Sequence, residues 1–188
     1  LYQLGTGENK NAKTPTLIPG LFVSQISAGY FHTICLNTNK TIVIFGSNDE
    51  GQLGLARSFE PIKTPRELSL GDIIQVACGY NHTLFLTSNN EVLGCGYNQF
   101  YQLGVKEPSV VETPQKLAGF PPIKKIITKT NQSFFIDEEE RLLACGANSY
   151  GQLGIGTKQS QHELTYLPSD FLDRLKLSDY SRIKSARK

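Results

Sequence analysis

The feature that most constrains this chain is an internal repeat with a period of fifty residues. Copies of a glycine-rich segment begin at Gly46, Gly96 and Gly146 and read GSNDEGQLG, GYNQFYQLG and GANSYGQLG. The chain opens with LYQLG, the end of a further copy, so the repeat marks end near residues 5, 54, 104 and 154. Self-similarity at a fixed period of this length indicates an array of structural units rather than an ordinary globular domain.

Two further landmarks support the same repeating unit. The segment SAGYFHTICL, residues 27–36, returns fifty residues later as ACGYNHTLFL, residues 77–86. Thr-Pro pairs stand at residues 14–15, 64–65 and 113–114, with nearly the same spacing. Three independent landmarks therefore define one recurring unit of about three and a half copies.

Each unit is predicted to form short β-strands. Runs rich in β-branched residues, 22–28 and 73–78, precede apolar runs at 32–36 and 82–86. Polar turns rich in Asn or acidic residues separate these runs from return strands, as hairpins require. No segment before residue 168 shows a helical period over three turns. The sequence thus predicts an all-β chain, a partial β-propeller of antiparallel blades.

The glycine-rich segment is predicted to be a structural turn. Glycine accepts a positive φ without steric cost, and Asn can bond the backbone of its own turn. The Gln is expected to satisfy loop backbone groups, and the Leu to insert between neighbouring sheets. The residues expected to do this are Gly46, Asn48, Gln52, Leu53, Gly54, Gly96, Asn98, Gln102, Leu103, Gly104, Gly146, Asn148, Gln152, Leu153 and Gly154.

Charge is distributed unevenly along the 188 residues. The formal net charge is +2, but residues 171–188 carry +4, which leaves −2 for the rest. The repeats are therefore not expected to bind nucleic acid. No apolar run approaches the ~18 residues that a membrane span needs. The basic tail, which could contact an anionic surface or form a solvated helix face, contains Arg174, Lys176, Arg182, Lys184, Arg187 and Lys188.

The cysteines are expected to be buried free thiols. No pair has C-x-x-C spacing, and Cys95 and Cys145 hold the place that Phe45 fills one repeat earlier. A position that accepts Phe or Cys belongs to a core. Free thiols favour a reducing compartment, so we expect an intracellular protein, cytoplasmic or nuclear.

No motif for chemistry is evident in the sequence. The chain contains no P-loop, nucleophile elbow or H-E-x-x-H segment. His32 and His82 occupy one repeat position, whereas His162 stands apart, so a metal cluster is not expected. We therefore expect no cofactor, no metal and no enzymatic catalysis.

The segments G-x-N-x-x-G-Q-L-G and G-x-x-H-T together resemble the repeats of the regulator of chromosome condensation family. The resemblance covers residues 1 to about 167. It implies a propeller of about seven four-stranded blades, in which each blade combines strands of adjacent repeats. Three and a half repeats cannot close such a ring. We therefore expect the remaining blades to lie upstream in the full protein, or a second copy to complete the ring.

The resemblance also indicates function and candidate contact residues. Family members include an exchange factor for the small GTPase Ran that binds the nucleosome, and several adaptors. We expect a protein-interaction propeller acting as adaptor or scaffold; the alternative is a guanine-nucleotide exchange factor for a Ran-like GTPase, and chromatin binding ranks third. An Asp in the middle of the G-x-x-H-T segment would favour exchange, and neither copy has one. By resemblance, partner contacts fall on Tyr30, Phe31, His32, Tyr80, Asn81 and His82.

A structural role for the same positions is the other interpretation. Each His would then fix its loop by hydrogen bonds at a strand start, and each Tyr would pack against the next blade. The third repeat departs from the pattern, because Lys129 and Gln132 stand where Gly and His are expected.

The repeat pattern stops after Leu167. Residues 1–168 are thus assigned to the repeats, and residues 169–188 to a basic tail or a linker to a following domain. Ser169 is a suitable N-cap for a short helix there, and a degenerate fourth repeat is the alternative.

Overall fold

The computed structural model describes residues 2–168, which form twelve strands and no helix. The strands make three separate four-stranded antiparallel sheets, each of which is a simple meander. The predicted all-β partial propeller is confirmed. The helix predicted for the basic tail lies outside the described residues.

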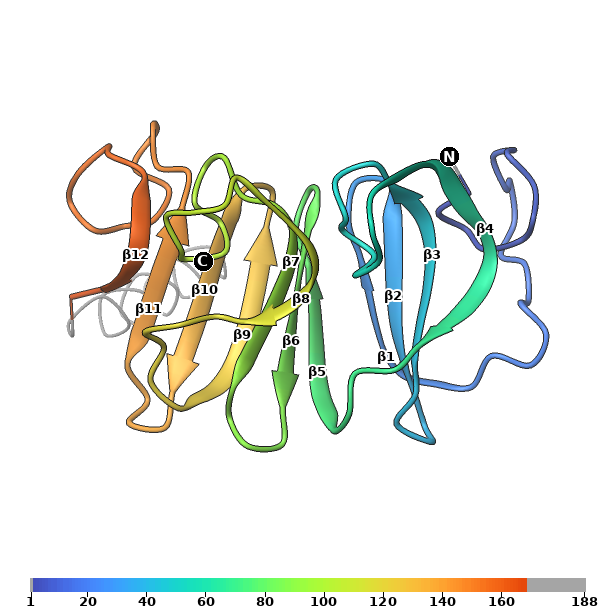
Figure 1. Cartoon of the computed structure of the whole chain (residues 1–188), viewed down its shortest axis with the longest axis horizontal. Coiled ribbons are helices and arrows are strands. Elements are labelled where there is room, and N and C mark those ends of the chain that lie inside the picture. Colours follow the sequence, from blue (N-terminus) through green and yellow to red (C-terminus); the bar gives the residue numbers. More distant parts are fainter. Residues whose placement is uncertain (1, 169–188) are drawn as a thin grey trace, which may run out of the picture.

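Each sheet is one blade, and Figure 1 shows the three blades side by side. Blade 1 comprises β1 (Val23–Ala28), β2 (His32–Asn37), β3 (Ile42–Asn48) and β4 (Ser58–Leu68). Blade 2 comprises β5 (Ile73–Cys78), β6 (His82–Thr87), β7 (Val92–Tyr97) and β8 (Val110–Lys116). Blade 3 comprises β9 (Ile123–Lys129), β10 (Gln132–Asp137), β11 (Leu142–Gly146) and β12 (Gln161–Tyr166).

The first strand of each blade is the inner strand, and the last is the outer edge. Strand β5 contacts both β1 and β9, so the inner strands of successive blades lie next to one another. The outer strand β4 contains Pro61 and Pro65. Proline has no N–H to donate, which confines it to sheet edges and protects such an edge from further pairing. The Thr-Pro landmarks at Thr64 and Thr113 thus belong to outer strands, an assignment that the sequence patterns did not provide.

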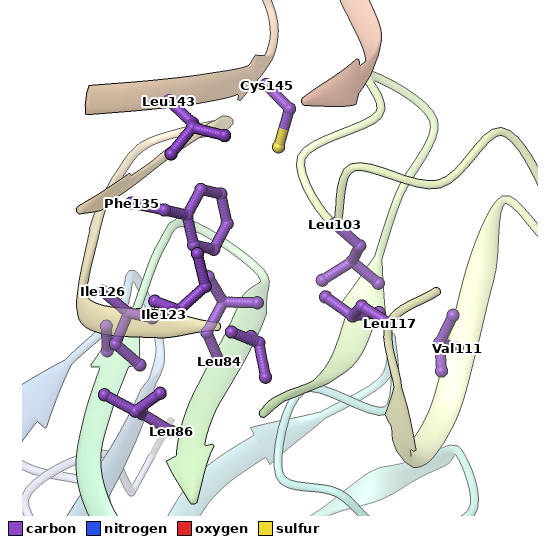
Figure 2. Packing of buried hydrophobic residues seen from close by; sticks show 12 residues of the cluster. Leu84, Leu86, Leu103, Val111, Leu117, Ile123, Ile126, Phe135, Leu143 and Cys145 are labelled. Atoms are coloured by element: carbon purple, nitrogen blue, oxygen red, sulfur yellow. The ribbon is translucent and has the colours of Figure 1, made fainter. Parts of the chain in front are cut away.

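The hydrophobic core lies between the blades. One cluster joins Leu36 and Ile44 of blade 1 to Val76 and Phe85 of blade 2. A second cluster joins blade 2 to blade 3, and Figure 2 shows its side chains converging from both sheets. Leu103 in the glycine-rich loop is fully buried in this second cluster. Each blade is therefore stabilised mainly by its neighbours rather than by a core of its own.

The first blade also has a small core on its other face. Cys35, Val43 and Phe45 are buried there under Ile18 and Leu21, which belong to the irregular segment before β1. In this way residues 2–22 cover part of the face that in blades 2 and 3 contacts a preceding blade.

The three glycines that open the repeat marks have matching surroundings. Gly46, Gly96 and Gly146 have φ of 107°, 99° and 106°. In each, an added Cβ would lie 2.3–2.4 Å from the carbonyl oxygen of the residue fifteen positions earlier. A side chain at these positions would therefore meet both an unfavourable backbone conformation and a steric clash.

The Asn and Gln of the repeat mark hold the loop together. In the first copy, Asn48 Oδ1 accepts the N–H of Leu53 at 3.0 Å, and Asn48 Nδ2 donates to the carbonyl of Ala56. Gln52 Oε1 accepts the N–H of Glu50 at 2.8 Å. The other two copies repeat the Asn–Leu and Gln–backbone bonds at 2.9–3.1 Å. Side chains of the loop thus satisfy backbone groups of the same loop.

Truncating a loop leucine should loosen the packing between two blades. We expect Leu103→Ala to lower the free energy of unfolding by about 2–5 kcal/mol, because it leaves a cavity between blades 2 and 3. Denaturant titration measures this change. Phe59→Ala is the control, since Phe59 is 90% exposed on the outer strand. An unchanged melting transition for Leu103→Ala would contradict the packing described here.

Candidate functional site

The G-x-x-H-T turns of the three repeats lie next to one another at one end of the blades. The N–H of Tyr30 donates to the carbonyl of Tyr80 at 3.0 Å. The N–H of Tyr80 in turn donates to the carbonyl of Thr130 at 2.7 Å. Because these bonds connect successive blades, residues fifty apart in sequence are neighbours in space.

A buried histidine links each blade to the next. His32 Nε2 lies 3.0 Å from Thr83 Oγ1 in blade 2, and that hydroxyl donates to the carbonyl of Gln52 at 2.7 Å. The hydroxyl uses its single proton on the carbonyl, so it must accept the proton of His32 Nε2. His82 and Ser133 repeat this arrangement between blades 2 and 3.

The glycine of the same turn makes room for this link. A Cβ on Gly29 would lie 2.1 Å from Cε1 of His32 and 2.6 Å from the carbonyl oxygen of Gly79. The first clash involves the histidine ring, and the second involves the backbone of the next blade. In the third repeat, Lys129 replaces the glycine and Gln132 replaces the histidine. The two replacements are compatible because, without a histidine ring, the position of the glycine no longer has to leave space for it.

Burial keeps both histidines neutral. Desolvation lowers the pKa of His32 to about 4 and that of His82 to about 3. Each Nδ1 is buried without a hydrogen-bond partner, which fits an imidazole that carries its proton on Nε2. Both side chains are fully buried, so neither imidazole is available to contact a partner directly. In the structure, His32 and His82 link successive blades. The resemblance implied that these two candidate residues contact a partner protein.

The aromatic residues beside the histidines are accessible. The rings of Tyr30 and Tyr80 stack across the joint between blades 1 and 2, with centroids 4.1 Å apart, and the ring of Phe31 lies 4.0 Å from that of Tyr30. Tyr30 is 50% and Tyr80 37% exposed. Hydrogen bonding with Tyr30, together with desolvation, raises the pKa of Tyr80. The tyrosines thus pack on one another and still remain partly exposed to solvent.

Two further aromatic residues lie on blade 2, beside the turn that contains Asn81. The N–H of Tyr97 donates to the carbonyl of Asn81 at 2.8 Å, and the rings of Tyr97 and Phe100 are 6.0 Å apart, edge to face. Phe100 is exposed. We call the set Tyr30, Phe31, Tyr80, Tyr97 and Phe100 the aromatic surface.

Sequence reasoning missed Tyr97 and Phe100 because they occupy the variable positions of the glycine-rich segment. The only signal was their aromatic character at positions that hold other residue types in the first copy.

An ionised carboxylate borders the aromatic surface on blade 1. Ser47, whose N–H donates to the carbonyl of Phe31, also donates from Oγ to Asp49 Oδ1 at 2.7 Å. Partial burial would raise the pKa of Asp49, but hydrogen bonds from Ser47 and Gln52 hold it below its usual value. The surface therefore combines large aromatic rings with a fixed negative charge.

Residues 2–168 provide neither a ready metal site nor a helix that could cross a membrane. Within this range no three His, Cys, Asp or Glu side chains gather closely enough to hold a metal ion. No helix of the described chain is long and apolar enough for a membrane span. The basic residues of the tail lie outside the described part.

Comparison with known proteins defines the class of protein that this fold represents. A family model described as "Regulator of chromosome condensation (RCC1) repeat" matches residues 1–36, 44–86 and 89–134, and a second model of the same description matches 23–52 and 73–102. The chain belongs to the family of RCC1-repeat β-propellers. The match at 44–86 runs from β3 to β6, so one sequence repeat supplies strands to two blades, as the resemblance implied.

Curated relatives match over shorter segments. The mouse protein "Regulator of chromosome condensation" is 47% identical over 60 residues, which is 31% of this chain and 14% of that protein. Human "Protein RCC2" is 34% identical over 69 residues, covering 35% of this chain and 13% of that protein. The aligned segments thus span only a small part of either relative.

Solved structures share the fold over most of the chain. Prp20p from Saccharomyces cerevisiae, described with its binding to Gsp1p and histones, has a TM-score of 0.72 at 21% identity and covers 78% of this chain. Human WBSCR16 has a TM-score of 0.67 at 26% identity with the same coverage. This chain spans 38% and 39% of those two chains.

Acid should weaken the links between blades. The folded chain holds His32 and His82 neutral, while the unfolded chain protonates them near pH 6.5. Because the unfolded state binds more protons, the free energy of unfolding should fall as the pH drops from 6.5 to about 4. Denaturant titrations at several pH values measure this slope.

The matched control replaces both histidines by Gln, the residue that blade 3 carries as Gln132. The variant should show a much smaller slope in the same pH window. The pKa values of Asp49 and Asp137 are lowered, so the stability that these carboxylates contribute is present above their usual pKa of 3.8 and is lost mainly below it. An equal slope in both proteins would assign the acid sensitivity to other groups.

Proposed function

We propose that this protein is an interaction propeller, an adaptor or scaffold that binds another protein through the aromatic surface. The observation that carries the proposal is the half-exposed stack of Tyr30 on Tyr80, which bridges two blades beside Phe31. Aromatic residues held rigidly and partly exposed are typical centres of protein interfaces.

The geometry supports this role in a second way. Backbone bonds between successive blades fix both tyrosines, so little conformational entropy remains to be lost when a partner binds. Asp49 adds a fixed negative charge at the edge of the surface, which would orient a partner that offers Arg or Lys.

An exchange factor for a Ran-like GTPase is the second candidate. It is favoured by the 47% identity to the mouse regulator of chromosome condensation and by the fold shared with Prp20p, a protein described as binding Gsp1p. Such a protein would need no residue that reacts covalently, only a surface that stabilises the nucleotide-free GTPase. Four buried free cysteines support our proposal that either activity belongs inside the cell.

Changing the centre of the aromatic surface should weaken partner binding without unfolding the chain. We expect Tyr80→Ala combined with Asn81→Ala to reduce affinity at least tenfold, which is about 1.4 kcal/mol. Affinity isolation from cell extract, followed by titration of the isolated partner, measures the effect. Tyr150→Ala is the control, since Tyr150 is 90% exposed on blade 3. A partner held equally by all three proteins would place the interface elsewhere.

A nucleotide-release assay separates the two candidates. The full-length protein is mixed with a panel of small GTPases, each loaded with a fluorescent guanine nucleotide. An adaptor leaves the release rate unchanged, even for a GTPase that it binds. Accelerated release that is lost in the Tyr80→Ala, Asn81→Ala variant would favour the exchange factor.

A further inference from the structure

The outer strand of blade 3 lacks the proline that the other two outer strands carry. Thr165 of β12 pairs with Ala144, and the residues that follow Pro65 and Pro114 pair with the equivalent positions of β3 and β7. Leu164 therefore stands where β4 has Pro65 and β8 has Pro114. Among the described residues β12 pairs only with β11, and Figure 1 shows it at the outer edge of its blade.

The backbone of β12 directs the N–H of Leu164 away from the sheet. The N–H of Leu167 donates inward to the carbonyl of Leu142 at 2.9 Å. Because residues of an antiparallel strand alternate in the side to which they hydrogen-bond, Thr165 also points inward and Leu164 outward. Proline is tolerated at this place in β4 and β8 for the same reason, since an outward N–H has no partner in the sheet to lose. Leu164 thus offers an N–H and a carbonyl at an edge that the other two blades protect.

A groove of about 390 Å³ lies between β12 and two loops of blade 2. Val105, Phe120 and Leu164 give it apolar walls. Lys106 and His162 also line it, and Lys106 is exposed and forms no ion pair with any described residue. The groove therefore combines apolar surface with an unpaired positive charge.

A tyrosine in one of these loops accounts for the groove. At the first joint Gly51 lies directly on the outer strand, where an added Cβ would be 2.7 Å from Cα of Glu112. At the second joint Tyr101 takes the place of Gly51, and His162 that of Glu112. The rings of Tyr101 and His162 lie 5.7 Å apart, so side chains stand between loop and strand where the first joint has close backbone contact. Tyr101 has a φ of 64°, which is unfavourable for a bulky residue and is thus maintained at a conformational cost.

A proline fills the corresponding space at the first joint. A Cβ on Gly54 would lie 2.8 Å from Cγ of Pro114. At the second joint, the atoms nearest to a Cβ on Gly104 belong to Phe120 and Cys145, at 3.0 and 3.2 Å, rather than to Leu164. The outer strand of blade 3 thus leaves open a space that the outer strand of blade 2 closes.

The edge and the groove are placed so that one extended chain could use both. A strand that pairs antiparallel with β12 would exchange two backbone hydrogen bonds with Leu164, at a Cα separation of about 5.5 Å. The side chain opposite Leu164 would lie on the same face of the sheet and enter the groove. The side chain two positions further along would lie opposite His162, where Lys106 also lines the groove.

We propose that β12 and this groove form a docking site for an extended segment of another protein, which adds a strand to blade 3 and carries an apolar residue opposite Leu164 and an acidic residue opposite His162. Backbone hydrogen bonds at the edge supply affinity, while the groove and Lys106 select the side chains. The proposal is independent of the aromatic surface, because none of the residues of that surface lines the groove.

A second copy of β12 fits this site less well. If two such strands paired antiparallel about Leu164, Tyr166 of one copy would lie opposite His162 of the other. No acidic side chain would then face Lys106. The unpaired charge therefore favours a partner segment of different sequence over self-association.

Restoring the missing proline tests the site with a defined probe. The probe is a fluorescent peptide, Thr-Val-Thr-Leu-Thr-Asp-Thr, whose Leu would face Leu164 and whose Asp would face His162. Its binding to the full chain is measured by fluorescence anisotropy. We expect Leu164→Pro to weaken binding about tenfold or more, because the variant loses the outward N–H and places a ring at the edge. The variant should keep its melting temperature, since β4 and β8 carry proline at the same place.

A charge exchange provides a second test that leaves the sheet untouched. Lys106→Glu should weaken binding of the probe about two- to fivefold, and a peptide with Lys in place of Asp should recover the loss. Lys40→Glu is the matched control, because Lys40 lies in a hairpin turn of blade 1 and makes the same change in net charge. This pair of measurements decides the question should Leu164→Pro fail to fold.

Backbone pairing has a direct signature in amide exchange. The N–H groups of Leu164 and Tyr166 should exchange rapidly in the free chain and slow down when the peptide binds. The N–H of Thr165, which points toward β11, should exchange at the same rate in both states. A peptide with N-methylated Leu should not produce this protection, because it lacks the N–H that bonds to the carbonyl of Leu164.

Four results would overturn the proposal. The first two are a wild-type chain that does not bind the peptide and a folded Leu164→Pro variant that binds it equally well. The third is a dimer of the wild-type chain that Leu164→Pro dissociates, which would make a second copy the occupant. The fourth is an N–H of Leu164 that is already protected in the free monomer, which would assign the edge to another segment of the same chain.

Discussion

The hydrogen bond from His32 to the hydroxyl of Thr83 connects three parts of the molecule at once. The hydroxyl belongs to the second strand of one blade, the imidazole comes from the blade before it, and the receiving carbonyl belongs to the loop of Gln52. One hydroxyl group on a strand of blade 2 is thus bonded both to a strand and to a loop of blade 1. Because an unpaired buried polar group is costly, this arrangement fixes the angle between blades more tightly than apolar packing alone.

On the equivalent face of blades 1 and 2, the apolar core exchanges side-chain volume between two positions. Blade 1 has Cys35 and Phe45, whereas blade 2 has Phe85 and Cys95 at the equivalent places. All four side chains are buried. One large and one small side chain are therefore kept per blade although their places are reversed. The stability of such a core depends on its total side-chain volume. A single substitution at either position therefore costs more stability than exchanging the two residues.

The sequence predicted the strands and the blade arrangement because three landmarks recur with one period. For His32 and His82 it left two interpretations open, a partner contact and a hydrogen bond that fixes the loop. The outer strand β4 was not assigned, because its prolines argue against a strand when the sequence is considered alone. The residues of β3 that pair with it lie in a different part of the repeat. The link made by Gln25 was also missed, because a single Gln in a strand gives no signal by itself. Its meaning appears only when the next inner strand is seen to place the N–H of Val76 against it. Likewise, Lys129 could be noted as a departure from the pattern, but the space that a glycine leaves there for the histidine ring is seen only in the distances around Gly29 and Gly79.

Each joint between two blades contains a buried cysteine whose reactivity depends on whether that joint is closed. Cys95 is buried in the joint between blades 1 and 2, and Cys145 in the joint between blades 2 and 3. Burial raises the pKa of both thiols, so neither forms the reactive thiolate while its joint is closed. A thiol reagent would therefore label each cysteine only when that particular pair of blades separates. The rate at which a reagent labels Cys95 would measure how often blades 1 and 2 separate, and the rate at Cys145 would do the same for blades 2 and 3. Comparing the two rates would show whether neighbouring blades open independently.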